Sequence, residues 1–260
     1  MLIADNLTYA IGTYKLVNQL SFHIRTGELV VLLGANGAGK SSLLRLLSGD
    51  KKASAGSLLL AGKDIGQYSK AQLALKRSVL AQQNVVNVAF RVEDLVMMGR
   101  YPHFQNKPSA HDLEVLEAVM AHTGLDRLAD RSYLTLSGGE QQRAQLARVL
   151  AQIWDVPGAL LLMDEPVAGL DIQYQQQTMA IAKQLSKKGF TVVAVLHDIN
   201  LAAQYGDRVI MLKNGRKWYD GTPIEVLKPR QIFEIFEIDV TTFTNPYTLK
   251  PFIIARDTLL

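Results

Sequence analysis

Short, continuously apolar blocks recur along the chain, and each is followed by a longer stretch of mixed polar and apolar residues. Glu28–Leu33, Ala159–Met163 and Thr191–Leu196 are such blocks. Uninterrupted apolar runs of this length are typical of parallel strands that are covered on both faces. The first block is followed by a helix-like stretch, Ser41–Leu47, that Gly49 should end. This alternation predicts an α/β domain with a largely parallel sheet.

The middle of the chain has a different pattern. Three helical stretches occur there without a strand signal of comparable strength: Val92–Met98, His111–His122 and Glu140–Trp154. In the last stretch, apolar residues recur at the i, i+3, i+4, i+7 spacing of one helix face: Leu146, Val149, Leu150 and Ile153. We therefore expect one domain over 1–260, with a helical lobe at about 88–156 inserted into an α/β core at about 1–87 and 157–260.

The pattern beyond His197 returns to short elements. A helix is expected over Asp198–Tyr205, then two strands, Arg208–Lys213 and Arg216–Tyr219, around Asn214-Gly215, a strong hairpin signal. Thr222 and Glu225 form a capping box with Pro223 at the first helical position. The sequence shows no internal repeat and no low-complexity linker.

Composition narrows the class of protein. The 260 residues are 48% hydrophobic, enough for the core of one large domain, yet no apolar run approaches the ~18–20 residues of a membrane span. The N-terminus lacks the pattern of a signal peptide, so we expect a cytosolic protein. The absence of cysteine excludes disulfides, zinc thiolates and cysteine nucleophiles. The sequence contains no Lys/Arg block with interleaved aromatics, the pattern that would indicate nucleic-acid binding. We therefore interpret the net charge of +4 as an ordinary basic surface.

A glycine-rich segment, GANGAGKS, lies between the first apolar block and the first helix. Glycines in that position let backbone N–H groups close around phosphate oxygens, and the helix N-terminus adds positive potential. Lys40 is expected to reach the β- and γ-phosphates of a nucleotide, and the Ser41 hydroxyl is expected to bind Mg²⁺. The predicted nucleotide-binding residues of this segment are Gly34, Ala35, Asn36, Gly37, Ala38, Gly39, Lys40, Ser41 and Ser42.

Two carboxylates, Asp164 and Glu165, follow the second apolar block. Strand ends in open parallel sheets face the ligand crevice. Asp164 is expected to hold Mg²⁺, directly or through water, and Glu165 to polarise the attacking water. Many strands end in Asp-Glu, so the pair indicates this chemistry only because a phosphate-binding loop precedes it in the same domain.

The segment Leu136–Glu140 reads LSGGE and opens the last helix of the lobe. Ser137 and Glu140 are explained by a capping box. The two glycines are not, because each glycine in a helix weakens it by about 1 kcal/mol relative to alanine. Bare backbone at a helix N-terminus is what a closely approaching phosphate requires, so Ser137, Gly138 and Gly139 are predicted to contact a nucleotide.

In their order and spacing, these segments resemble the ATP-binding subunits of ABC transporters over nearly the whole chain. Residues 34–41 resemble the family's Walker A motif, 136–140 its signature motif, and 160–164 its Walker B motif, with Glu165 at the position of the catalytic base. Three further matches complete the resemblance: Ala168–Asp171 with the D-loop, Gln82 with the Q-loop glutamine, and His197 with the switch histidine. Taken alone, His197 would be an ordinary polar residue at a strand end.

The resemblance implies a P-loop NTPase fold of the ABC ATPase type, with a mostly parallel sheet, an N-terminal antiparallel β portion and an inserted helical lobe. It implies hydrolysis of ATP, with Glu165, His197 and Gln82 as catalytic residues. Mg²⁺ would be bound by Ser41, Gln82 and Asp164. Two ATP molecules would be sandwiched in a head-to-tail homodimer, in which Ser137, Gly138 and Gly139 come from the partner subunit.

The resemblance also implies partners and a location. Because the chain has no membrane segment, a transporter role requires two permease subunits, docked on the helical lobe near Gln82, and through them a periplasmic substrate-binding protein. The chain would then be a peripheral protein on the cytoplasmic face of the bacterial inner membrane, with no nucleic-acid partner. The family's adenine-stacking aromatic falls at Ile11, ahead of Gly12; Tyr9 and Tyr14 are the nearby aromatic alternatives, and either could instead be a packing residue.

A narrower resemblance concerns the cargo. Gly99–His103, His197–Ala203 and Asp220–Pro223 are similar to segments of bacterial importers of iron-siderophores, haem and cobalamin, and Gln141–Trp154 is most similar to the haemin-import branch. Structurally, Gly99–His103 could be only a turn after a helix. Import of a ferric siderophore or cobalamin remains an alternative, as do an exporter ATPase and a soluble ABC ATPase acting on DNA or ribosomes. The last class usually carries long coiled coils, cysteine zinc modules or two such domains.

Overall fold

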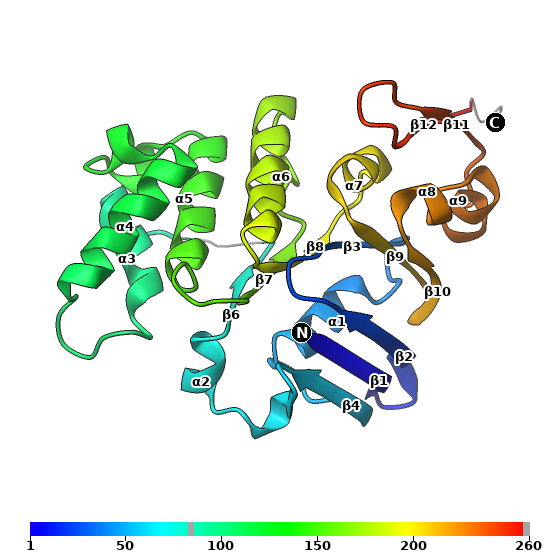
Figure 1. The fold of residues 1–260 in the computed structure, drawn as a ribbon, viewed down its shortest axis with the longest axis horizontal. Coiled ribbons are helices and arrows are strands. Elements are labelled where there is room, and N and C mark those ends of the chain that lie inside the picture. Colours follow the sequence, from blue (N-terminus) through cyan, green and yellow to red (C-terminus); the bar gives the residue numbers. More distant parts are fainter. Residues whose placement is uncertain (83–85, 257–260) are drawn as a thin grey trace.

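The computed structural model describes residues 1–82 and 86–256. Its centre is a six-stranded sheet in the order β10-β9-β3-β8-β7-β6 (Figure 1). Neighbouring strands from β9 to β6 run parallel, and only β10 is antiparallel to its neighbour. The strands span Leu29–Leu33 (β3), Arg77–Leu80 (β6), Leu160–Asp164 (β7), Thr191–Val195 (β8), Arg208–Lys213 (β9) and Arg216–Gly221 (β10). The predicted parallel sheet is confirmed.

A second, antiparallel sheet has the order β2-β1-β4-β5 and lies below the first in Figure 1. It comprises Leu2–Ile11 (β1), Tyr14–Ile24 (β2), Ala55–Leu60 (β4) and Lys63–Asp64 (β5), with helices α1 (Lys40–Leu47) and α2 (Lys70–Ala74) beside it. This sheet is the antiparallel portion that the family resemblance implied.

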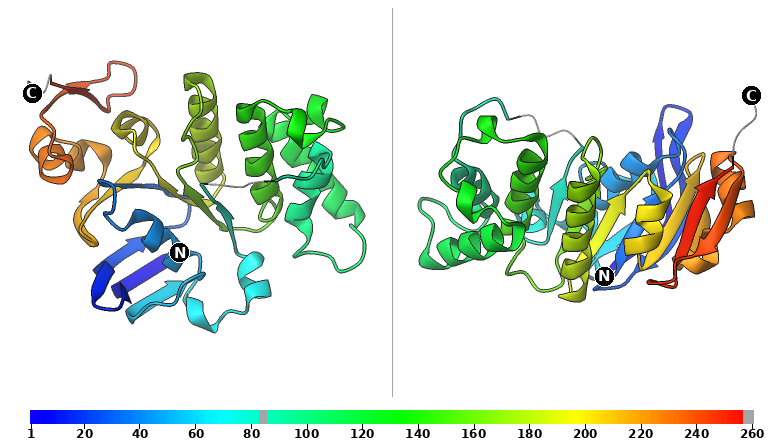
Figure 2. Two further views of the ribbon diagram at one scale, coloured as in Figure 1. Left: turned by 180° about the vertical axis from the view of Figure 1, so that it is seen from behind. Right: turned by 90° about the horizontal axis from the view of Figure 1, so that it is seen from above.

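Helices cover the other face of the central sheet and extend past its β6 edge (Figure 2). Those near the sheet are α6 (Ile172–Lys187), α7 (Ile199–Tyr205), α8 (Pro223–Val226) and α9 (Pro229–Phe236). The helical lobe contains α3 (Val92–Met97), α4 (Ala110–Thr123) and α5 (Gly138–Ala151). A C-terminal hairpin, β11 (Val240–Thr244) and β12 (Pro251–Ala255), lies beside α7. The helical lobe is confirmed, whereas its limits at 88 and 156 stay a prediction.

Strand β3 is continuously apolar because it is buried on both faces. Leu29, Val31 and Leu33 belong to the core that also contains the lobe helices, whereas Val30 and Leu32 belong to the core between the two sheets. Alternate side chains of a strand point to opposite faces, so a strand covered on both faces needs apolar residues at every position. The hairpin at Asn214-Gly215 and the capping box at Thr222 are likewise confirmed.

The last lobe helix differs from the prediction at both ends. It begins at Gly138 and ends at Ala151, three residues before Trp154. Beyond its end, the side-chain amide of Gln152 donates to the backbone carbonyls of Ala74, at 2.7 Å, and Arg77, at 2.9 Å. These partners lie in the α/β core, so a long-range contact ends a helix that local sequence would continue.

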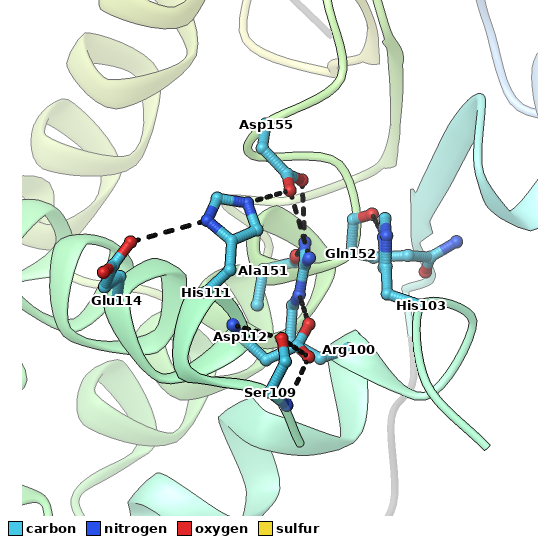
Figure 3. A network of polar contacts seen from close by, with 9 residues as sticks. All are labelled: Arg100, His103, Ser109, His111, Asp112, Glu114, Ala151, Gln152 and Asp155. Carbon is cyan, nitrogen blue, oxygen red and sulfur yellow. Dashed lines mark hydrogen bonds and ion pairs between the residues drawn. The ribbon is translucent and has the colours of Figure 1, made fainter. Parts of the chain in front are cut away.

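The segment Gly99–His103 is more than a surface turn, because Arg100 is only 1% exposed. Its guanidinium pairs with Asp112 at 2.9 Å and with Asp155 at 2.7 Å, and it donates to the carbonyl of Ala151 at 3.0 Å (Figure 3). His111 adds a contact to Asp155 at 2.8 Å. Burial raises the pKa of the Asp112 and Asp155 carboxyls, but the hydrogen bonds that they accept lower it by more, so that both pKa values lie below the usual range. Ser109 and Arg100 donate to Asp112, and Arg100 and His111 contact Asp155. This network joins α4 to the end of α5.

Arg100→Leu should lower the free energy of unfolding by about 3–5 kcal/mol, because it leaves the buried Asp112 carboxylate without its charge partner. Arg91→Leu is the matched control in the same lobe. The Arg91 side chain is 50% exposed and pairs with Glu93 and Asp130 at the surface, so its loss should cost less than about 1 kcal/mol. Urea unfolding measures both; equal losses would contradict the role assigned to Arg100.

Candidate functional site

The glycine-rich loop connects β3 to α1, as predicted. Gly39 has a φ of 99°, and a Cβ there would lie 2.3 Å from the carbonyl oxygen of Leu16, so only glycine fits this close approach. Leu16, which the sequence did not single out, lines the hollow in front of the loop with Asn36 and Glu165. The loop thus presents bare backbone on one side and packs tightly on the other.

Lys40 lies inside this loop. Its Nζ donates to the carbonyls of Gly34 at 2.8 Å and Ala35 at 3.1 Å, and the residue is 6% exposed. Burial lowers the pKa of Lys40, while the nearby Glu165 and Asp164 carboxylates act in the opposite direction. An ammonium group that is buried against carbonyls is placed to exchange them for phosphate oxygens.

Ser41 and Asp164 meet across the space between α1 and the end of β7. The Ser41 hydroxyl donates to Oδ1 of Asp164 at 3.2 Å. Burial raises the pKa of Asp164, against the opposing effect of the Ser41 hydrogen bond. Residues 1–82 and 86–256 contain no cluster of three or more His, Cys, Asp or Glu side chains suited to a metal ion. A hydroxyl beside a carboxylate instead fits a hard cation such as Mg²⁺ that shares its remaining ligands with a nucleotide.

The three predicted catalytic residues form one contact group. Gln82 Nε2 donates to Oε2 of Glu165 at 2.7 Å, and His197 Nε2 lies 2.7 Å from Oε1 of the same carboxylate. Glu165 has a φ of 50°, an uncommon conformation for a residue other than glycine, and such backbone strain concentrates at functional sites. Residues from β6, β7 and β8 ends therefore converge beside the phosphate loop.

The signature segment begins α5 as a capping box. Ser137 Oγ accepts from the Glu140 N–H, and the Glu140 carboxylate accepts from the Ser137 N–H at 2.8 Å. Its two glycines differ: Gly138 is exposed, with open space where a Cβ would lie, whereas Gly139 is buried against Tyr174. Helix α1 lies under the central sheet and α5 lies in the lobe (Figures 1 and 2). The phosphate loop, which precedes α1, and the signature segment, which begins α5, therefore lie in different parts of one chain.

The three candidate positions for adenine stacking differ in how far their side chains are exposed. Tyr9 is half-buried against the core between the sheets, which identifies it as a packing residue. Ile11 and Tyr14 face each other across β1 and β2 and are 63% and 66% exposed. Tyr14 is two residues before Leu16, which lines the phosphate-loop hollow, and the pairing of β2 with β1 is irregular between Lys15 and Val17.

Asp171, the last of the D-loop residues, caps α6 by accepting from the Tyr174 N–H at 2.9 Å. A contact that sequence reasoning missed links α5 to the chain after Glu165: Gln142 Nε2 donates to the carbonyl of Pro166 at 3.1 Å. A glutamine on the polar side of a helix carries no sequence signal for such a partner. Across the described residues, no helix is both long and apolar enough to cross a membrane.

Comparisons with known proteins agree with this arrangement. Residues 17–168 match the family described as ABC transporter. The chain is 41% identical over 257 residues to the hemin import ATP-binding protein HmuV of Gloeobacter violaceus, covering 98% of this chain and 94% of that protein. It is 39% identical over 257 residues to the protein of the same name from Pseudomonas aeruginosa, covering 98% of this chain and 100% of that one.

One solved structure that is similar over most of the fold is itself a dimer. It is an ATP-binding cassette bound to ADP and Pi, with a TM-score of 0.73 and 27% identity, covering 85% of this chain and 98% of that one. The family match spans more than half of the described chain, and the similarity to these relatives is nearly end to end. The chain belongs to the ABC transporter family.

Proposed function

We propose that this chain is the ATP-hydrolysing subunit of a bacterial haemin importer and that it works as a homodimer. The observation that carries the proposal is the contact group of Gln82, Glu165 and His197 beside the phosphate loop. A carboxylate held on both oxygens is positioned to orient an attacking water, and phosphoryl transfer depends mainly on such positioning and on charge stabilisation.

Each site residue then has a role in hydrolysis. Lys40 would exchange the carbonyls of Gly34 and Ala35 for phosphate oxygens, and the loop N–H groups of 34–42 would surround those phosphates. Mg²⁺ held by Ser41 and Asp164, with Gln82 beside them, would supply further positive charge at the phosphates. Gln82 and His197 would move from Glu165 toward the γ-phosphate when ATP binds, so their contacts report whether that phosphate is present.

The homodimer is supported by the exposed helix N-terminus at Ser137 and Gly138. Both face solvent, so a nucleotide held by another subunit could approach them. The related ADP- and Pi-bound cassette is itself dimeric. In the proposed dimer, ATP bound to one phosphate loop contacts the partner's signature segment, and hydrolysis releases the contact.

The assembly would include two permease subunits and, through them, a periplasmic substrate-binding protein. Relatives named for hemin import, near 40% identity and almost full length, support this cargo. Docking on the lobe near Gln82 is supported by the exposed side chains of Val88 and Tyr101, which are 55% and 59% exposed. The chain would lie on the cytoplasmic face of the inner membrane, with no nucleic-acid partner.

Reconstitution into proteoliposomes with the permease encoded beside it tests this function. ATP-dependent uptake of haemin, a ferric siderophore and cobalamin is compared, with Lys40→Ala as the inactive control. Haemin uptake alone supports the proposal, and uptake of either other cargo overturns the assignment of haemin. Recovery of ribosomes or DNA, and of no membrane partner, from detergent extracts would contradict the importer role.

Tyr14→Ala should raise the dissociation constant for ATP about tenfold, because base–aromatic stacking contributes about 1–3 kcal/mol. Equilibrium binding of ATP to the isolated protein measures this effect. Tyr247→Ala is the control, since that side chain is 94% exposed in the C-terminal hairpin loop. An unchanged ATP affinity in Tyr14→Ala would remove Tyr14 from the site.

A further inference from the structure

The two signature glycines have different surroundings within the same chain. A Cβ on Gly138 would meet no atom within 4 Å, whereas a Cβ on Gly139 would lie 2.5, 2.6 and 2.8 Å from Cδ2, Cε2 and Cγ of Tyr174. Carbon atoms that are not bonded pack best at about 3.5–4.0 Å, so the ring excludes any side chain at 139. Packing against Tyr174 of the same chain is therefore sufficient to require a glycine at position 139.

The Tyr174 ring covers one face of the first turns of α5. The Arg143 guanidinium, one turn beyond Gly139, lies 5.1 Å from the centre of the same ring, within the range of a cation–π contact. Tyr174 belongs to the first turn of α6, and its backbone N–H is held by the cap residue Asp171. The ring therefore fixes the start of α5 to the start of α6.

A second contact follows the same route. Gln142, on the same helix, donates to the carbonyl of Pro166, which directly follows Glu165. The chain from Glu165 to Tyr174 is thus joined to the signature helix at both of its ends. In the proposed dimer, Glu165 serves the nucleotide on its own phosphate loop, whereas Ser137 and Gly138 serve the partner's nucleotide.

We propose that Tyr174 is a positioning residue, which sets the height of the α5 N-terminus over the partner's nucleotide and is the reason for a glycine at 139. The proposal deepens the proposed function and rests on it for the cross-subunit contact. Tyr174 touches no reacting atom; it acts through the placement of Ser137 and Gly138. It also connects the two nucleotide pockets of the dimer, because the segment that it anchors begins at Glu165.

The test is a substitution cycle of Gly139→Ala, Tyr174→Ala and the two together. Overpacking at 139 should lower the kcat for ATP hydrolysis about thirtyfold, and Tyr174→Ala about threefold. The double variant should return to about threefold, because the smaller residue at 174 removes the clash. Tyr174→Phe, which keeps the ring, should match the parent. ATP binding to the monomer should stay unchanged in all of them, while ATP-dependent dimer formation in the Glu165→Gln background falls with kcat.

Gly138→Ala is the matched control, since its Cβ meets no atom of this chain. Its loss of turnover should persist when Tyr174→Ala is added. A double variant at 139 and 174 that stays as slow as Gly139→Ala, or rescue of Gly138→Ala by Tyr174→Ala, would overturn the proposal. If the parent hydrolysed no ATP, the proposed function would fail. The clash between positions 139 and 174 would then still be tested by the unfolding midpoints of the same variants. Adding Tyr174→Ala should restore the midpoint of Gly139→Ala but not that of Gly138→Ala.

Discussion

Glu165→Gln should lower steady-state ATP hydrolysis by about 10²–10⁴-fold while ATP binding persists, because a general base contributes a factor of this size. Glutamine keeps the shape of the side chain and can still contact Gln82 and His197, but it cannot accept a proton from water. Since ATP closes the proposed dimer and hydrolysis opens it, this variant should accumulate as an ATP-bound dimer. Light scattering after size-exclusion chromatography, with and without ATP, measures the shift.

Glu140→Gln is a useful control for that variant. Glu140 is a capping residue whose carboxylate accepts from the Ser137 N–H, and glutamine preserves a capping box. It should therefore leave turnover within about twofold of the parent. A Glu165→Gln protein that stays monomeric with ATP, or that hydrolyses ATP at the parental rate, would contradict the role given to Glu165.

Lys40→Ala should lower ATP hydrolysis by about 10²–10³-fold and should also weaken ATP binding, because it removes the positive charge buried in the phosphate loop. This combination separates it from Glu165→Gln, which keeps the bound nucleotide. Stopped-flow binding of a fluorescent ATP analogue and a phosphate-release assay measure the two effects.

Lys107→Ala, an exposed lysine in the lobe, is the matched control for charge and should change neither quantity. Because only two loop carbonyls lose a donor in Lys40→Ala, the free energy of unfolding should change by no more than about 1–2 kcal/mol. Parental nucleotide affinity in Lys40→Ala would show that the loop does not hold the phosphates.

Sequence predicts best where local chemistry decides the structure. The apolar run of β3, the Asn214-Gly215 hairpin and the capping boxes at Ser137 and Thr222 depend on periodicity, backbone conformation and neighbours three residues away, and the sequence predicts all of them. The convergence of Gln82, Glu165 and His197 follows from parallel strands whose ends meet at one edge of a sheet. The order of the motifs supplied the identity of these residues, and topology explains their proximity.

Sequence predicts poorly where the deciding partner is distant. The end of α5 depends on the bonds from Gln152 to Ala74 and Arg77, and a buried Arg100 depends on carboxylates from two other segments. The packing of Gly139 against Tyr174 has no sequence signal, because Tyr174 lies 35 positions further along the chain, and the nucleotide contact of Gly139 stays a prediction. The C-terminal hairpin is held to α7 by paired bonds between Asn200 and Ile253, which no local pattern indicates.

The central claim is that each ATP is bound between the phosphate loop of one subunit and the signature segment of the other. Lys40→Ala and Gly138→Asp should each be inactive as homodimers. The aspartate should be tolerated by the fold, since position 138 is open and acidic residues are favoured at helix N-termini, but it would repel a phosphate.

Mixing these two inactive variants in equal amounts is the most direct measurement. Half of the dimers should then pair unlike chains, and each mixed dimer has one pocket with an intact phosphate loop and an intact signature segment. We expect turnover at about one quarter of the parental rate. A chain that carries both substitutions, mixed with Lys40→Ala, should stay inactive as a control. A mixture of the single variants that is no more active than either alone would contradict the shared pocket.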